Sequence, residues 1–111
     1  MATKATAALP SGIIAVHVAS STTGDYHRFE PGFTSNVNIQ KPGNDDAEFN
    51  TTTITFSVGG NNVTATLPAG SRSAHVLLNN EHYYRFETSG ATITVAPGDA
   101  ALFGTVNFTS S

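Results

Sequence analysis

The chain has 111 residues, of which 39% are hydrophobic and only 12% are charged, and its formal net charge is −3. This length suits one domain with a modest core. Five Lys and Arg residues are too few to form the basic surface that nucleic-acid binding requires. The chain has no Cys, which excludes a disulfide framework and a thiolate metal site.

The N-terminal segment 1–12 lacks the apolar stretch of a secretory signal, and no part of the chain has the length and hydropathy of a membrane span. We therefore expect a soluble chain that does not insert into a membrane. The sequence does not indicate a compartment.

Alternation of apolar and polar residues, interrupted by Gly, Pro and Asn, predicts strands along the whole chain. It is clearest in 53–58, where Ile54, Phe56 and Val58 share one side. The run Gly-Gly-Asn-Asn at 59–62 predicts a tight turn between two strands. The predicted strands are 4–9, 13–19, 25–30, 35–40, 51–58, 62–67, 73–78, 82–88, 91–96 and 101–109.

The two halves of the chain resemble each other. Segment 9–18 matches segment 67–76 in its Leu-Pro, Gly and His-Val positions, at a constant offset of 58 residues. Residues 26–30 read YHRFE and residues 83–87 read YYRFE, at an offset of 57. Identities in the same order predict a tandem duplication within a single domain, 1–111, with repeats at approximately 4–58 and 62–111.

Two β units of about 50 residues cannot each bury a core, so we expect them to pack together. The predicted fold class is all-β. In detail, we expect an antiparallel β-sandwich of jelly-roll or Greek-key type, with about ten strands from two five-strand repeats related by a pseudo-twofold axis.

The repeated pentapeptides divide between the two faces of a strand because side chains alternate. Phe29 and Phe86 are the candidate core residues. His27 lies on the same side of its strand as Phe29, and Tyr84 lies on the same side as Phe86. The opposite side carries the pattern Tyr-x-Arg-x-Glu in each copy. The residues predicted to face outward are Tyr26, Arg28 and Glu30 in the first copy and Tyr83, Arg85 and Glu87 in the second.

A histidine on the preceding strand joins each outward group. We expect Ile14, Val16 and Val18 to face the core, so that His17 faces away from it, and the same alternation turns His75 outward. If each of these strands forms a hairpin with the next, His, Tyr, Arg and Glu share one face in each repeat.

Such a group suits a sugar. Arg offers a planar set of donors, Glu offers acceptors, and Tyr offers a flat apolar ring with a polar end. The sequence therefore predicts a non-catalytic, lectin-like carbohydrate-binding module, in which two copies of the site raise avidity for a glycan. The predicted ligand-binding residues are His17, Tyr26, Arg28 and Glu30, and their counterparts His75, Tyr83, Arg85 and Glu87.

A second interpretation remains open. Arg and Glu two positions apart on a strand often pair with neighbouring side chains, so the repeated groups are equally suited to a structural or subunit contact. That interpretation predicts a structural assembly protein, such as a capsid-decorating or fibre-like subunit. Under both interpretations we expect a homo-oligomer.

The sequence contains little that indicates metal binding, catalysis or phosphate binding. The acidic segment 44–48 lacks the spacing of an EF-hand, so we expect a solvated loop and no metal site. The chain has no Gly-x-Ser-x-Gly motif and no phosphate-binding glycine-rich loop. We therefore predict no enzymatic activity, no catalytic residues and no cofactor.

Overall fold

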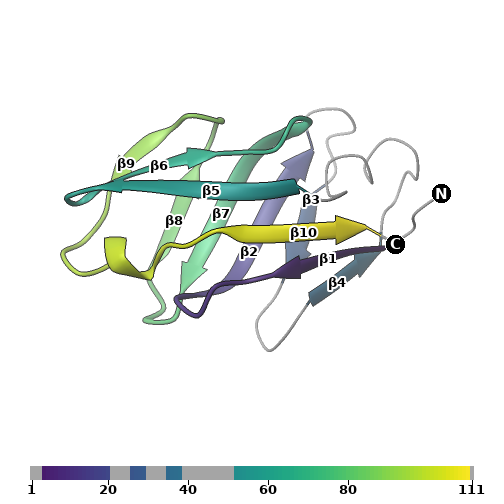
Figure 1. Cartoon of the computed structure of the whole chain (residues 1–111), viewed down its shortest axis with the longest axis horizontal. Helices are drawn as coiled ribbons and strands as arrows, with labels where there is room; N and C mark the ends of the chain where they lie inside the picture. Colours follow the sequence, from purple (N-terminus) through teal and green to yellow (C-terminus); the bar gives the residue numbers. More distant parts are fainter. Residues whose placement is uncertain (1–3, 21–25, 30–34, 39–51, 111) are drawn as a thin grey trace.

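The computed structural model describes residues 4–20, 26–29, 35–38 and 52–110 (Figure 1). Within these ranges the chain forms ten strands and one short 3₁₀ turn, so the predicted all-β class is confirmed. The elements are β1 (Lys4–Ala8), β2 (Ile13–Ser20), β3 (Tyr26–Phe29), β4 (Ser35–Asn38), β5 (Thr52–Gly59), β6 (Asn62–Thr66), β7 (Ser71–Leu78), β8 (Tyr83–Phe86), β9 (Thr92–Thr94), η1 (Ala100–Leu102) and β10 (Val106–Ser110).

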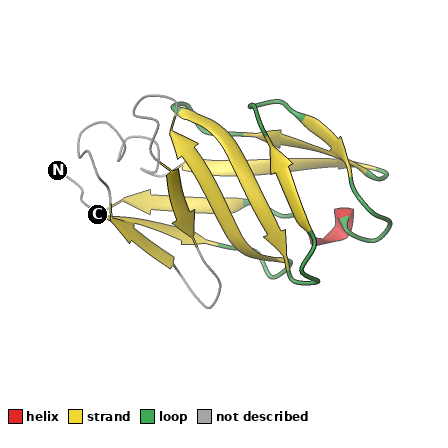
Figure 2. Ribbon diagram, turned by 180° about the vertical axis from the view of Figure 1, so that it is seen from behind, coloured by secondary structure: helices red, strands yellow, loops and turns green. Residues whose placement is uncertain are grey.

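The strands form two antiparallel sheets. The larger sheet has the order β4-β1-β10-β5-β6-β9, and the smaller has the order β3-β2-β7-β8. The six-stranded sheet lies nearer the viewer in Figure 1, and the four-stranded sheet lies nearer in Figure 2. Each sheet therefore has one face toward the other sheet and one face toward solvent.

Aromatic pairs connect the two sheets. Phe29 on β3 packs against Phe108 on β10 with ring centroids 5.2 Å apart, and Phe86 on β8 packs against Phe56 on β5 at 5.3 Å. Phe29 and Phe86 have no exposed surface, which confirms that both belong to the core. Burial of each ring contributes about 1.5–3 kcal/mol, and the tilted contact adds to this.

The hairpins β2–β3 and β7–β8 have the same register. His17 lies opposite Arg28 in the first hairpin, and His75 lies opposite Arg85 in the second. Strands β2 and β7 also pair with each other, and there His17 lies opposite His75. Strands β1 to β5 correspond, in order, to strands β6 to β10. When every strand is replaced by its counterpart, each sheet keeps the same strand order, read in the opposite direction.

The predicted tight turn joins β5 and β6, which are paired up to Gly59 and Asn62. Gly60 occupies the first position of this two-residue turn with a φ of +64°, a conformation that glycine adopts without the steric cost a side chain brings.

Two local predictions were wrong. Ile13, not Ile14, joins the core, because the register of β2 against β7 shifts between Ile13 and Ala15. The last strand begins at Val106, not at 101, because residues 100–102 form the 3₁₀ turn. The acidic segment 44–48 lies outside the described residues.

Three turns meet at one end of the molecule. The backbone N–H of Asn79, in the β7–β8 turn, donates to the Gly12 carbonyl, in the β1–β2 turn, over 3.0 Å. A Cβ on Gly12 would lie 2.1 Å from the carbonyl oxygen of Leu102 in η1, so only glycine fits there. This contact brings the turn before η1, which carries Asp99, close to the β7–β8 turn.

Candidate functional site

A line of four side chains crosses the four-stranded sheet on the face away from the core. The registers place them in the order Arg28 on β3, His17 on β2, His75 on β7 and Arg85 on β8. Both arginines are exposed and both histidines are half-buried. Since neighbouring strands lie about 4.8 Å apart, the Cα atoms of the two arginines are about 14 Å apart. We call these four residues the Arg–His row.

The ring of Tyr83 lies against this row. Its centroid is 6.4 Å from that of His17 and 5.9 Å from that of His75, with edge-to-face geometry in both contacts. The guanidinium carbon of Arg85 lies 5.8 Å from the same ring centroid. Tyr83 nevertheless stays 42% exposed. Contacts with three side chains therefore orient an aromatic ring that solvent still reaches.

Glu87 adds an acceptor at the edge of the row. Its Oε1 atom lies 3.3 Å from Nε2 of His75, and its side chain is 67% exposed against 18% for the histidine. Because the Glu87 side chain is so exposed, this contact contributes little to stability. The face thus presents donors, an acceptor and an aromatic ring side by side.

The structure places six of the eight predicted ligand-binding residues on this face. They are His17, Arg28, His75, Tyr83, Arg85 and Glu87. Tyr26 lies opposite Ala19 at the start of β3, and only its backbone is described. Glu30 lies outside the described residues. The sequence predicted two separate groups, whereas the pairing of β2 with β7 brings both histidines into one line.

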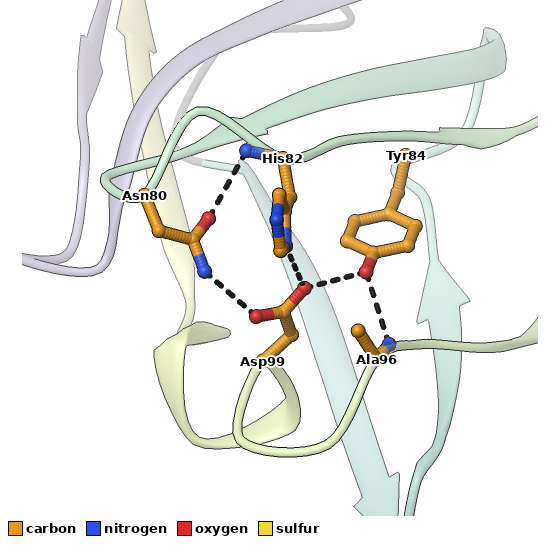
Figure 3. Close-up of polar contacts among 5 residues, drawn as sticks. All are labelled: Asn80, His82, Tyr84, Ala96 and Asp99. Atoms are coloured by element: carbon orange, nitrogen blue, oxygen red, sulfur yellow. Dashed lines mark hydrogen bonds and ion pairs between the residues drawn. The ribbon is translucent and has the colours of Figure 1, made fainter.

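A second polar cluster surrounds a buried carboxylate and was not predicted from the sequence (Figure 3). Oδ2 of Asp99 accepts a hydrogen bond from the Tyr84 hydroxyl at 2.5 Å and lies 2.6 Å from Nδ1 of His82. Oδ1 accepts one from the Asn80 side chain at 2.7 Å. The side chain of Asp99 is 4% exposed and that of His82 is 53% exposed. We call Asn80, His82, Tyr84 and Asp99 the Asp99 cluster.

The hydrogen bonds of this cluster decide its charge. Those from Tyr84 and His82 lower the pKa of Asp99, outweighing the burial that raises it. Burial is the main cause that raises the pKa of Tyr84, although the Ala96 N–H, which donates to its oxygen at 3.0 Å, acts in the opposite direction. Near neutral pH the cluster therefore holds an ionised aspartate that accepts from a neutral tyrosine.

The cluster joins two turns. Asn80 and His82 belong to the β7–β8 turn, in which Asn80 Oδ1 also accepts from the His82 N–H at 3.0 Å and Glu81 has a φ of +72°. Asp99 belongs to the turn before η1. In the sequence, Pro97-Gly98-Asp99 indicates only a turn, because the partners of the aspartate lie 15 to 19 residues away.

Among the described residues, no group of three or more His, Asp or Glu side chains is arranged to hold a metal ion. The same part of the chain contains no helix with the length and apolar character of a membrane span. Comparison with protein-family models, with curated proteins and with solved structures finds no significant match.

Proposed function

We propose that the chain is a non-catalytic carbohydrate-binding module of lectin type, and that its ligand lies on the outer face of the four-stranded sheet. The observation that carries the proposal is the exposed ring of Tyr83, oriented by His17 and His75 and bordered by Arg85. A sugar has a C–H face that packs on such a ring and hydroxyls that need both donors and acceptors. Arg85 supplies donors and Glu87 supplies acceptors.

The ligand face has two quasi-equivalent halves in this proposal. One consists of His17, Tyr26, Arg28 and Glu30, and the other consists of His75, Tyr83, Arg85 and Glu87. The halves meet where His17 lies opposite His75. A glycan long enough to contact both halves gains avidity, because the second contact is intramolecular once the first has formed.

We also infer that the two sheets form a β-sandwich of jelly-roll or Greek-key type, produced by duplication of a unit corresponding to 4–58 and 62–111. The equal registers of the two hairpins support this origin. So do the aromatic pairs Phe29–Phe108 and Phe86–Phe56, which join corresponding strands at nearly equal distances of 5.2 and 5.3 Å. A pseudo-twofold axis that passes between His17 and His75 explains why these two corresponding histidines lie opposite each other.

A glycan array, followed by haemagglutination with sugar competition, tests the proposed function. We expect binding to a defined set of glycans that Tyr83→Ala abolishes and Tyr83→Phe retains, because phenylalanine keeps the flat ring. Val58→Ala is the matched control. Val58 is also a large exposed apolar residue, at 50%, but it lies on β5 in the other sheet, so its loss should leave binding unchanged.

The competing function is a structural assembly in which the same face contacts a neighbouring subunit. It predicts no glycan binding, together with a large stable assembly in size-exclusion chromatography that dissociates in the Tyr83→Ala variant. That combination of results would contradict the carbohydrate-binding proposal.

A further inference from the structure

We propose that two copies of this chain form a dimer by pairing their β9 strands, which joins the two six-stranded sheets into one continuous sheet. β9 is the last strand in the order β4-β1-β10-β5-β6-β9, and Figure 1 shows it along the margin of that sheet. It pairs with β6 on one side and with no strand of the described part of the chain on the other. This edge belongs to the larger sheet and is separate from the proposed glycan face on the smaller one.

The outer edge of β9 offers backbone hydrogen bonds. In an antiparallel pair, alternate residues direct their N–H and C=O groups toward the partner strand, and the residues between them direct theirs away. The Val95 N–H donates to the Asn61 carbonyl at 2.8 Å, and the Ala91 carbonyl accepts a bond from β6 at 3.0 Å. By this alternation, Thr92 and Thr94 direct their backbone groups away from β6. Within the described ranges, these outward groups have no hydrogen-bond partner.

β9 also lacks the features that keep an edge strand from pairing with another chain. Charged side chains, prolines and bulges serve that purpose in most sheets. The two edge strands of the smaller sheet carry exposed arginines, Arg28 on β3 and Arg85 on β8. Segment 90–96 reads GATITVA, with no charged residue and no proline. Two copies that each have a net charge of −3 can therefore meet at β9 without like charges at the contact.

One register of the dimer satisfies all of the outward groups. If a twofold axis passes through Ile93, Thr92 lies opposite the partner's Thr94, and each such pair exchanges two N–H···O bonds. Threonines opposite each other form a favourable cross-strand pair. The β6–β9 pair already contains one, in which the hydroxyls of Thr64 and Thr92 are 2.6 Å apart. Ile93 is half-buried against the core and would meet the partner's Ile93 on that side. A second copy of the chain is therefore complementary to this edge.

The shortness of β9 limits the strength of the dimer. The strand has three residues. We expect a single strand pair of this length to bury less than the about 1,200 Å² at which stable interfaces begin. The dimer should therefore dissociate on dilution.

Sedimentation velocity over about a hundredfold range of protein concentration tests the dimer. We expect a monomer at the lowest concentration and a dimer at the highest. Hydrogen exchange followed by NMR locates the contact, because the Thr92 and Thr94 amides should exchange more slowly as the dimer forms. A monomer at every concentration, or a dimer in which these two amides gain no protection, would overturn the proposal.

Charge variants test the register. Thr94→Lys places two lysines diagonally across the axis and should weaken dimerisation at least about tenfold, and Thr92→Glu should do the same with two carboxylates. The double variant places each new glutamate opposite a new lysine of the other copy, so dimerisation should return to within about threefold of the unchanged chain. Thr55→Lys is the matched control. Thr55 is also an exposed threonine of the larger sheet, but it lies on β5, between β10 and β6, so dimerisation should stay within about twofold.

The remaining outcomes each decide against the proposal. If the double variant stays monomeric, the register is wrong and the pairing of β9 with β9 is overturned. Fibres would mean that β9 pairs with another edge of the next copy. A dimer that Tyr83→Ala dissociates would place the contact on the smaller sheet. Circular dichroism and a thermal melt establish that each variant is folded. None of these results depends on glycan binding, so the carbohydrate-binding proposal stands or fails separately.

Discussion

The Arg–His row and the Asp99 cluster are both polar groups on an apolar β framework, but they differ in what remains available to a partner. In the Asp99 cluster, three side chains converge on one carboxylate that is 4% exposed, so its binding capacity is used within the chain. In the row, both arginines are exposed and the adjoining ring of Tyr83 is 42% exposed. Buried networks whose groups are satisfied stabilise a structure, whereas exposed donors can bind a ligand. We therefore expect the cluster to govern stability and the row to govern binding.

The largest effect on stability should follow Asp99→Ala. The substitution leaves the donors of Tyr84, His82 and Asn80 without their common acceptor, and stranded donors cost more than the net value of the lost hydrogen bonds. We expect the lowest melting temperature of all the variants considered for the two polar groups. Glycan affinity per folded molecule should be unchanged. An Asp99→Ala protein that melts normally but no longer binds glycan would reverse the two roles.

Acid should also act on the cluster. The pKa of Asp99 is lowered in the folded chain, chiefly by the hydrogen bond from Tyr84, so near its ordinary value of 3.8 the unfolded chain binds more protons than the folded chain. The contribution to stability is therefore complete above that pH and is lost as the pH falls through the folded-state pKa. Denaturant unfolding at several pH values should show that the stability difference between the natural chain and Asp99→Asn shrinks in this acidic range. A difference independent of pH would contradict the charge assigned to Asp99.

The neighbours Tyr83 and Tyr84 offer an intermediate test, because they point to opposite faces of β8. Tyr84→Phe removes the hydroxyl that donates to Asp99 and accepts from Ala96, and it should cost about 1 kcal/mol of unfolding free energy. Tyr83→Phe should cost less than about 0.5 kcal/mol, the range of ordinary surface substitutions. Chemical denaturation of both variants gives the comparison. Equal losses would mean that the row is as structural as the cluster.

The smallest effect on stability should follow Arg85→Ala. The side chain is exposed, and no ion pair to a carboxylate is recorded for it in the described part of the chain, so the unfolding free energy should change by less than about 0.5 kcal/mol. Denaturant unfolding measures this change. A cost of about 2 kcal/mol or more would identify Arg85 as a structural residue.

The sequence predicted the outward position of His17 and the burial of Phe29 and Phe86, because strand alternation is a local property of the chain. It did not predict that His17 lies opposite His75, since pairing between distant strands leaves no local periodicity. Ile14 was misplaced for a related reason: the register shift at the start of β2 interrupts the alternation on which the prediction depended.

Asp99 shows a different limit of sequence analysis. An aspartate after Pro-Gly is typical of an exposed turn, and the residue is buried only because the β7–β8 turn brings two donors to it and Tyr84 brings a third. His27 occupies the register position in the first hairpin that corresponds to Tyr84 in the second. The sequence repeat alone therefore could not indicate the cluster.

The central claim is that the outer face of the four-stranded sheet is the ligand-binding surface, and an NMR titration of the isotope-labelled chain with the glycan that binds most strongly on the array tests it most directly. We expect chemical-shift changes concentrated at His17, Arg28, His75, Tyr83 and Arg85, with the Asp99 cluster and the outer face of the six-stranded sheet unchanged. Changes centred on that larger sheet or on the Asp99 cluster, with the Arg–His row unaffected, would contradict the claim.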